Sequence, residues 1–183
     1  MTLIILDRDG VINHDSDHYI KSVDEWQPIE GSIEAIARLS RAGYTIAVAT
    51  NQSGLARGLF SADELEAMHQ KMCGLIESAG GKIAGIFFCP HHPDDNCDCR
   101  KPEPGLVDQI AEALAVDVSG AIFVGDSLKD LQVGLARGCI PMLVKTGKGE
   151  KTLRHLNDGA LPGVEVAVFD NLKGVADALL QVQ

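Results

Sequence analysis

The sequence has few positive charges and no long apolar run. Its 16 lysines and arginines are outnumbered by 26 aspartates and glutamates, which gives a formal net charge of −10. Neither a nucleic-acid backbone nor an anionic membrane is an expected partner, because both would be repelled. No apolar run is long enough to span a bilayer, and we expect no signal peptide before Leu3. The sequence therefore favours a cytosolic protein.

Internal repeats and low-complexity linkers are also missing, so no composition shift divides the chain into separate units. At 183 residues, 45% of them hydrophobic, the chain is long enough to bury a substantial core. We therefore expect one domain over residues 1–183. Its five cysteines should stay reduced in the cytosol, and clustered cysteines then favour a metal over disulfides. An anionic small substrate would need a metal or local positive charge to hold it.

The N-terminal stretch is the most informative part of the chain. Residues 3–6 are four large apolar residues, and Asp7-Arg8-Asp9-Gly10 follows directly. An uninterrupted apolar run is typical of a strand buried on both faces of a parallel sheet. Side chains two apart on a strand point the same way, so Asp7 and Asp9 should converge where the strand ends. Two such carboxylates repel, and a hard cation such as Mg²⁺ relieves the repulsion. The alternative is a surface turn rich in Asp and Gly.

Apolar segments alternate with helical ones along the rest of the chain. Strands are expected at 3–6, 44–49, 83–88, 120–124, 140–144 and 164–168. Helices are expected at 30–41, 61–79, 104–115, from about 128 to 137, 150–156 and 171–180. This alternation predicts an α/β fold, with a parallel sheet of about six strands between two layers of helices. Residues 13–28 show no periodicity and are expected to form a long loop beside the two aspartates, either functional or a solvated connector.

The helix expected at 61–79 begins with a capping box, in which Ser61 is followed three residues later by Glu64. Its apolar residues fall at helical spacing and are expected in the core; they are Met68, Met72, Leu75 and Ile76. His69 is expected on the helix surface.

Polar residues follow the second and fourth expected strands. Thr50-Asn51-Gln52-Ser53-Gly54 offers a hydroxyl and amides that can donate hydrogen bonds to an anion, although a plain turn would look the same. Asp126 ends the fourth strand, and Asp130 lies one helical turn further. Because such sheets bind ligands beyond the carboxyl ends of their strands, these groups should meet Asp7 and Asp9.

The densest cluster of metal-binding side chains lies between residues 89 and 99. Three cysteines and two histidines occur there, and thiolates with imidazole select Zn²⁺. One plausible ligand set is Cys89, His91, Cys97 and Cys99, with His92 as an alternative to His91. Four protein ligands leave no position for a reacting water, so the zinc would be structural. Arg100 and Lys101 follow immediately, and a metal-stiffened loop would hold these two cations for phosphate recognition.

Taken together, four motifs resemble those of the haloacid dehalogenase (HAD) phosphatase superfamily. In chain order they are Asp7-Arg-Asp9-Gly, Thr50-Asn51, Lys101-Pro102 and Gly125-Asp126-Ser-Leu-Lys-Asp130. The stretch 50–58 and the zinc loop, about 89–101, resemble more narrowly the D-glycero-D-manno-heptose-1,7-bisphosphate 7-phosphatase family, close kin of the histidinol-phosphate phosphatases. Members of both can carry the zinc loop, so the loop identifies the branch better than the substrate.

The resemblance implies a role for each motif. Asp7 would be the nucleophile that forms an aspartyl-phosphate, and Asp9 would act first as acid and then as base. Mg²⁺ would be held by Asp7, the Asp9 backbone carbonyl and Asp126, with Asp130 behind them. The residues expected to bind phosphate or substrate are Thr50, Asn51, Gln52, Ser53, Arg100, Lys101, Asp15, His18 and Tyr19.

The spacing of the motifs leaves no room for the cap domain that many HAD enzymes carry. Residues 9–50 hold one loop and one helix, and residues 53–100 hold a helix, a strand and the zinc loop. The resemblance thus implies a capless, monomeric phosphatase that removes the 7-phosphate of heptose 1,7-bisphosphate for lipopolysaccharide-core or related heptose nucleotide synthesis. Either anomer fits, and a histidinol-phosphate or other small phosphomonoester phosphatase is the nearest alternative. A nucleic-acid end phosphatase shares the motifs but does not suit the acidic balance. In a phospho-receiver domain, a lone aspartate would end the third strand, where this chain has Cys89.

Overall fold

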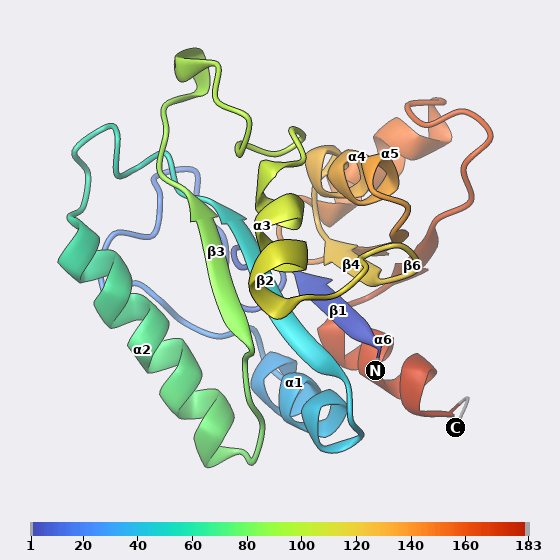
Figure 1. Ribbon diagram of the computed structural model, residues 1–183, viewed down its shortest axis with the longest axis horizontal. Coiled ribbons are helices and arrows are strands. Elements are labelled where there is room, and N and C mark those ends of the chain that lie inside the picture. The colour runs from blue at the N-terminus through green and yellow to red at the C-terminus, as the bar shows by residue number, and fades with distance from the viewer. Residues whose placement is uncertain (1, 182–183) are drawn as a thin grey trace.

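The computed structural model describes residues 2–181, and within them six strands alternate with six α-helices (Figure 1). The strands are β1 (Leu3–Leu6), β2 (Thr45–Asn51), β3 (Gly85–Cys89), β4 (Ile122–Gly125), β5 (Ile140–Val144) and β6 (Ala167–Phe169). The helices are α1 (Ser32–Arg41), α2 (Ala62–Ser78), α3 (Gly105–Leu114), α4 (Leu128–Ala136), α5 (Gly149–Asn157) and α6 (Leu172–Gln181). A short 3₁₀ helix spans Pro93–Asp95.

All six strands lie parallel in one sheet, in the order β3-β2-β1-β4-β5-β6. β1 takes a central position because its four apolar residues are all buried. Ile4 lies opposite Ile46 of β2 on one side and Ile122 of β4 on the other. The strand order reverses between β1 and β4, and ligands of such sheets bind beyond the strand ends at that point.

Two apolar cores pack on the two faces of the sheet. Ile4 and Leu6 belong to the first core, together with buried residues of α1, α2 and α6. Leu3 and Ile5 belong to the second, together with residues of α3 and α4. Figure 1 shows α3 lying across the front of the sheet. The predicted three-layer α/β/α arrangement is therefore confirmed.

The long loop between β1 and α1 is packed against the protein. Trp26 is fully buried in the first core, and Ile20 is 8% exposed. The ammonium group of Lys71 on α2 donates hydrogen bonds to the backbone carbonyls of Val23 and Trp26, at 2.8 and 2.6 Å. These contacts exclude the interpretation of residues 13–28 as a solvated connector. They also hold the loop beside the end of β1.

The capping box at the start of α2 is confirmed, but two predictions for that helix are wrong. His69 is 5% exposed although it was expected on the surface, and Leu75 is 38% exposed although it was expected in the core. The ring of His69 lies 6.1 Å from the ring of Phe88, centroid to centroid. A segment distant in sequence thus covers a side of α2 that the spacing of its own apolar residues assigns to solvent.

The sixth strand begins three residues later than predicted. Residues 161–163 form a turn, in which the Val164 amide donates to the carbonyl of Leu161 and Gly163 has a φ of +74°. Only Ala167–Phe169 pairs with β5, at the edge of the sheet. The apolar residue Val164, which was expected to begin this strand, lies outside it and is 37% exposed.

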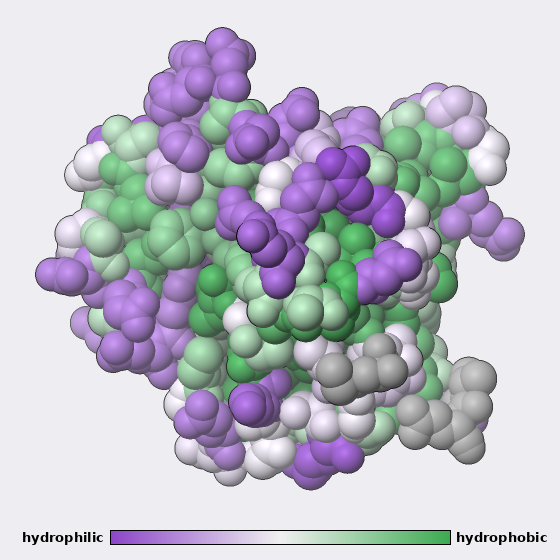
Figure 2. All heavy atoms as spheres, viewed as in Figure 1, coloured by the Kyte–Doolittle hydropathy of each residue, from purple (hydrophilic) through white to green (hydrophobic). Residues whose placement is uncertain are grey.

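The connections between the first three strands hold no extra domain within residues 2–181. β1 and β2 are joined by the long loop and α1, and β2 and β3 by a loop and α2. The capless arrangement is therefore confirmed for the part of the chain that the structure describes. In that same part, no helix is both long and apolar enough to cross a membrane. Figure 2 shows hydrophilic residues gathered at the end of the molecule where the chain between β3 and α3 runs.

Candidate active site

A cavity of about 620 Å³ opens beyond the carboxyl ends of β1, β2 and β4. It lies at the switch point of the sheet, as the strand order requires. Of the catalytic and substrate-binding residues predicted from the sequence, the cavity is lined by Asp7, Asp9, Asp15, Tyr19, Thr50, Asn51, Gln52, Ser53, Arg100, Lys101, Asp126 and Asp130. His18 is not among the lining residues, and its side chain is exposed.

Lys101 joins two aspartates at the bottom of the cavity. Its Nζ lies 2.9 Å from Asp7 Oδ1 and 2.7 Å from Asp130 Oδ1, and it donates to the carbonyl of Ala49 at 2.8 Å. Burial opposes its charge, but the carboxylates of Asp130 and Asp7 outweigh burial and raise the pKa of Lys101 above its ordinary value. The ammonium group is therefore charged and fixed in place.

Asp130 is fully occupied by hydrogen bonds. Its Oδ1 accepts from Lys101, and its Oδ2 accepts from the backbone amides of Asp126 and Ser127 and from the Ser127 hydroxyl. Burial opposes ionisation of Asp130, but the charge of Lys101 and these donors hold its pKa below the ordinary value. An anion saturated by donors in this way supports Lys101 and the start of α4.

Asp7 and Asp126 have the opposite electrostatic environment. Burial and then the charge of Asp130 raise the pKa of Asp7 to about 7, against the lowering effect of Lys101. Burial, followed by the charges of Asp7 and Asp130, raises the pKa of Asp126 to about 9. Carboxylate oxygens of all three aspartates lie within 4.8 Å of one another. This crowding of hard oxygen ligands fits a divalent cation such as Mg²⁺.

A glycine keeps the space between Asp7 and Asp126 open. Gly10 has a φ of +85°, and a Cβ there would collide with the carboxylate of Asp126. The backbone amide of Lys148 donates to Asp126 Oδ2 at 2.8 Å and orients the carboxylate. Asp126 and Asp7 thus point into one small polar space at the end of β1 and β4.

Asp9 is held by three side chains. Its Oδ1 accepts from Arg8 Nη2 at 3.0 Å and from Asn13 Nδ2 at 2.9 Å, and its Oδ2 accepts from Gln52 Nε2 at 2.9 Å. Burial raises its pKa, but the charge and hydrogen bond of Arg8, with those of Asn13 and Gln52, outweigh burial and lower it. The carboxylate of Asp9 is accordingly an anion with a defined orientation.

Arg8 and His69 are buried residues that the sequence analysis did not assign to the site. The guanidinium of Arg8 is completely buried, and its Nη1 lies 3.2 Å from His69 Nε2. Burial, and next the charge of Arg8, lowers the pKa of His69 to about 4, so the ring is neutral near pH 7. One signal was available: an arginine between two aspartates that follow a buried strand must itself be buried and needs a partner.

The residues after β2 lie close to the two catalytic candidates. Thr50 and Ser53 are 1% and 8% exposed, and Gln52 Nε2 donates to Thr50 Oγ1 as well as to Asp9. The side chain of Asn51 makes two hydrogen bonds to the backbone of Lys101, to its carbonyl at 3.2 Å and from its amide at 3.0 Å. Asn51 therefore fixes the end of the zinc loop to β2.

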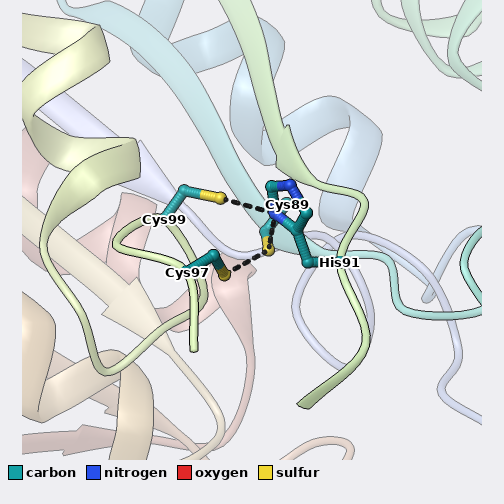
Figure 3. A group of neighbouring side chains, drawn as sticks. All are labelled: Cys89, His91, Cys97 and Cys99. Carbon is teal, nitrogen blue, oxygen red and sulfur yellow. Dashed lines mark hydrogen bonds between the residues drawn. The ribbon is translucent and has the colours of Figure 1, made fainter. Parts of the chain in front are cut away.

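The predicted zinc ligands form one cluster at the end of β3 (Figure 3). Ligand atoms of Cys89, His91, Cys97 and Cys99 all lie within 4.8 Å of one another. Cys89 Sγ is 3.6 Å from Cys97 Sγ, and His91 Nδ1 is 3.2 Å from Cys99 Sγ. Tetrahedral Zn²⁺ with bonds of about 2.3 Å to sulfur separates two thiolates by about 3.8 Å, so the cluster fits zinc.

His92 is turned away from this cluster. Its Nδ1 accepts from the Asp94 amide at 3.2 Å, and its own amide donates to Asp95 Oδ2 at 2.8 Å, so it caps the 3₁₀ helix. Of the two histidines left open by the sequence, His91 is the one beside the thiols. Sequence spacing does not distinguish two adjacent histidines, because the choice depends on the direction in which the chain turns.

Comparison with known proteins adds relatives over the whole chain. D-glycero-β-D-manno-heptose-1,7-bisphosphate 7-phosphatase of Pseudomonas aeruginosa is 58% identical over 181 residues, covering 98% of both chains. The heptose bisphosphate phosphatase of Bordetella bronchiseptica, solved with magnesium and phosphate, superposes with a TM-score of 0.94 at 52% identity, over 100% of both chains. The chain belongs to the heptose bisphosphate phosphatase family of HAD-like hydrolases. It is an enzyme of the phosphatase class.

Two family models agree with this membership. The model described as Polynucleotide kinase 3 phosphatase matches residues 2–135, so the chain also belongs to that wider phosphatase family. The HAD-hydrolase-like model matches residues 98–174. The heptose bisphosphate phosphatase from Burkholderia thailandensis covers 98% of this chain and 99% of its own, with a TM-score of 0.75 at 43% identity. The HAD fold expected from the four motifs is therefore confirmed.

This family member has a rim of cations that its sequence did not reveal. Besides Arg100, the cavity is lined by Lys129, Lys148 and Lys151. Lys148 Nζ lies 3.7 Å from Asp15 Oδ2, but within residues 2–181 no carboxylate lies within 4.0 Å of Arg100, Lys129 or Lys151. Burial and the nearby charges of Arg100 and Lys148 lower the pKa of Lys129. In a chain of net charge −10, such a group of uncompensated cations marks a site for an anion.

The loop after β1 also lines the cavity. Asp15, Ser16, Asp17 and Tyr19 line the cavity on this side. The Arg57 guanidinium, from the loop after β2, lies 5.8 Å from the centre of the Tyr19 ring. Loops after three different strands therefore meet above the carboxylates, and in a capless enzyme they are the elements that can contact a substrate.

Proposed function

We propose that the protein removes the 7-phosphate of D-glycero-D-manno-heptose 1,7-bisphosphate through an aspartyl-phosphate on Asp7. The enzyme names of the full-length relatives support this substrate. The observation that carries the proposal is the combination of a buried carboxylate pair at the bottom of the cavity with unpaired cations at its rim. One end of the cavity suits the phosphate that reacts, and the other suits a phosphate that does not.

Asp7 is suited to act as the nucleophile. Its Oδ1 accepts from the Arg8 amide at 2.8 Å and contacts Lys101, which leaves Oδ2 to attack phosphorus. A bond forms between Asp7 Oδ2 and phosphorus, and the bond between phosphorus and the sugar oxygen breaks. Lys101, with donors from Thr50 and the backbone after β2, would offset the charge of the phosphoryl oxygens.

Asp9 lies in the cavity beside Asp7 and is the candidate acid and base. In the first step a protonated Asp9 would give its proton to the departing sugar oxygen, and in the second the Asp9 anion would take a proton from the attacking water, which it would carry into the next turnover. That water breaks the aspartyl-phosphate and releases phosphate, which regenerates Asp7. In the orientation described here Asp9 is an anion held by Arg8, Asn13 and Gln52, which matches the base of the second step.

Asp7 and Asp126 would hold Mg²⁺ together with the backbone carbonyl of Asp9. The crowded carboxylates with raised pKa values fit such a cation, whereas Asp130 has no free oxygen. When bound, Mg²⁺ lowers the repulsion between an anionic nucleophile and an anionic phosphate.

The charge of the rim favours the sugar bisphosphate over histidinol phosphate. Histidinol phosphate carries an amine that is positively charged at neutral pH, close to its phosphate, and an imidazole at its far end, so it offers no second anion to Arg100, Lys129 and Lys151. The second phosphate of the bisphosphate would be attracted by the same three side chains. Asp15 and Asp17, which also line the cavity, are acceptors suited to sugar hydroxyls.

We further propose that Zn²⁺ bound by Cys89, His91, Cys97 and Cys99 is structural. These ligands belong to the loop that ends in Arg100 and Lys101, so the metal would hold both cations in place relative to Asp7. The chain would act as a single-domain monomer over residues 1–183 in the cytoplasm, and its product would feed heptose nucleotide synthesis for the lipopolysaccharide core.

Steady-state kinetics on both anomers of heptose 1,7-bisphosphate and on histidinol phosphate test the proposal. We expect kcat/KM to be highest for one anomer of the bisphosphate. In Arg100→Ala, the KM for the bisphosphate should rise about 10- to 100-fold, the loss expected for a charge-assisted hydrogen bond. The kcat/KM for histidinol phosphate should increase or stay equal. Lys82→Ala, an exposed lysine that does not line the cavity, is the matched control. A preference for histidinol phosphate would overturn the substrate assignment.

A further inference from the structure

The inference concerns the buried pair formed by Arg8 and His69. Arg8 sits between Asp7 and Asp9 in the sequence, yet its guanidinium is 0% exposed and points toward α2. One nitrogen, Nη2, donates to Asp9 Oδ1 at 3.0 Å, and the other, Nη1, faces His69 Nε2 at 3.2 Å. Within residues 2–181, Nε has no hydrogen-bond partner. The side chain is therefore positioned by two contacts, one to Asp9 and one to His69.

The chemistry of the two groups determines the direction of the second hydrogen bond. A guanidinium has only donors, so His69 Nε2 must be the acceptor and must carry no proton. His69 is then neutral, as its burial and the adjacent charge require. A neutral ring is a suitable partner, because a carboxylate there would pair with Arg8 and compete with Asp9 for it.

His69 comes from the middle of α2, in a helix whose buried face includes Met68 and Met72. Its ring lies 6.1 Å from that of Phe88 on β3 and is tilted 53° to it, so the imidazole is supported by packing from the sheet. The α2 helix and β3 therefore fix His69, His69 fixes Arg8, and Arg8 contacts Asp9. No other charged side chain donates to Asp9 within the described part of the chain.

We propose that His69 is a positioning residue that acts through Arg8 to hold Asp9 where it can exchange a proton with the leaving group and the water. The inference rests on the proposed role of Asp9 in phosphate monoester hydrolysis. Without an acceptor at position 69, the Arg8 guanidinium keeps a donor unsatisfied in a dry environment and moves to find another acceptor. Asp9 then loses one of its three side-chain contacts, the charged one, so its carboxylate is less firmly oriented and proton transfer becomes less efficient.

Two variants of His69 separate this role from simple packing. Gln keeps an acceptor for Arg8 Nη1, whereas Leu fills similar space without one. Met72→Leu, one turn further along the same buried face of α2, is the control for a change in packing alone. All three proteins are compared by thermal unfolding, so that a loss of fold is recognised.

Two substrates then report on proton transfer. From heptose 1,7-bisphosphate the leaving group is the alkoxide of heptose 1-phosphate, which needs a proton, whereas from p-nitrophenyl phosphate it is the stabilised p-nitrophenolate, which needs none. Because kcat/KM covers the steps up to formation of the aspartyl-phosphate, only the first substrate depends on Asp9 as an acid in this parameter. We expect His69→Leu to lower kcat/KM about tenfold for the bisphosphate and less than twofold for p-nitrophenyl phosphate, through kcat rather than KM. His69→Gln should keep most of the wild-type kcat/KM for the bisphosphate. Met72→Leu should leave the ratio of the kcat/KM values for the two substrates unchanged.

Equal losses on both substrates in His69→Leu would overturn the inference in favour of a purely structural role, and so would no loss on either. Wild-type protein that does not hydrolyse the bisphosphate but does hydrolyse another alkyl phosphate would instead contradict the proposed substrate. The same ratio would then be measured with that alkyl ester, so the two failures can be told apart.

Discussion

Asp7 lies at a point where several charges meet, and this environment has a cost as well as a use. Its carboxylate is buried beside Asp126 and Asp130, and the cation paired with it is Lys101. Burial and like charges raise its pKa to about 7. Repulsion between these carboxylates therefore destabilises the folded state, and other interactions in the fold must offset this destabilisation.

Asp7→Asn should separate activity from stability. The amide keeps the shape of the side chain but cannot attack phosphorus, so we expect turnover to fall by more than about 10³-fold. The free energy of unfolding should stay equal or increase, because the substitution removes one of three crowded carboxylates. Kinetics with heptose bisphosphate and urea unfolding measure the two effects. Substantial turnover in Asp7→Asn would refute its role as nucleophile.

His69 should make the stability of the protein depend on pH. Its pKa is about 4 in the folded state, because burial and Arg8 disfavour the charged ring, whereas it is near 6.5 in the unfolded chain. The unfolded chain therefore binds the proton more readily between these values, and stability is complete above pH 6.5 and lost as pH falls toward 4. At about 1.4 kcal/mol per unit, the contribution lost between pH 7 and pH 5 is about 2 kcal/mol.

Urea unfolding of the wild type and His69→Gln at pH 7 and pH 5 checks this expectation. The variant lacks the titrating ring, so the difference between the two proteins removes the effects of the aspartates, some of which have the opposite sign. The free energy of unfolding of the wild type should decrease more than that of the variant. An equal decrease in both would show that His69 is charged in the folded protein.

Among the elements, the zinc loop has two fixed ends and little regular structure between them. Cys89 ends β3, and Cys99 precedes Arg100, and both thiols are buried in the second core. Between them lies only the short 3₁₀ helix Pro93–Asp95. A loop of this length without a metal would have few contacts to order it.

The loop should therefore depend on zinc more than the rest of the fold does. Purified protein should contain about one zinc per chain, retained when Mg²⁺ is removed. After treatment with a strong zinc chelator, we expect proteolytic cleavage between residues 90 and 98, a rise of about tenfold or more in KM, and a melting temperature lowered by several degrees. Elemental analysis, mass spectrometry of the fragments and kinetics measure these effects. An active enzyme without zinc and with an uncleaved loop would contradict this expectation.

The success of sequence reasoning differs between elements for physical reasons. β1 and β5 have the predicted limits, and for β1 the reason is that a strand buried on both faces requires an uninterrupted apolar run. α2 begins where Ser61 and Glu64 predict, because the capping box is a local interaction. β6 was misplaced, because an edge strand of three residues depends on pairing with β5. The burial of His69 depends on residues far away in the sequence, namely Arg8 after β1 and Phe88 in β3.

The candidate site shows the same division. Residues that end central strands, such as Asp7 and Asp126, were brought together as predicted, because parallel strands deliver their ends to one edge. Lys129 and Lys151 were missed, because their place on the cavity rim depends on how α4 and α5 pack. His18 was expected at the cavity but is exposed, since a loop without periodicity does not reveal which side chains point inward.

At the scale of the whole molecule, positive charge is concentrated at one cavity although the chain as a whole is acidic. The chain has a net charge of −10, yet one cavity is lined by Arg100, Lys101, Lys129, Lys148 and Lys151. Screening limits the reach of the net charge to about 8–10 Å in physiological salt, so a phosphate at the cavity is influenced mainly by these five cations. An acidic protein can thus attract a small anionic substrate to one cavity.

The central sheet should make the chain unfold as one unit. Ile4 and Leu6 of β1 belong to the first core, and Leu3 and Ile5 belong to the second, so neither layer of helices can separate without exposing β1. β4 is shared in the same way, through Ile122 and Val124 on one side and Phe123 on the other. With zinc in place, we expect a single calorimetric transition in which the calorimetric and van't Hoff enthalpies agree. Two resolved transitions would contradict the expectation of one domain over residues 1–183, and a calorimetric enthalpy well above the van't Hoff value would contradict the coupling of the two cores through β1 and β4.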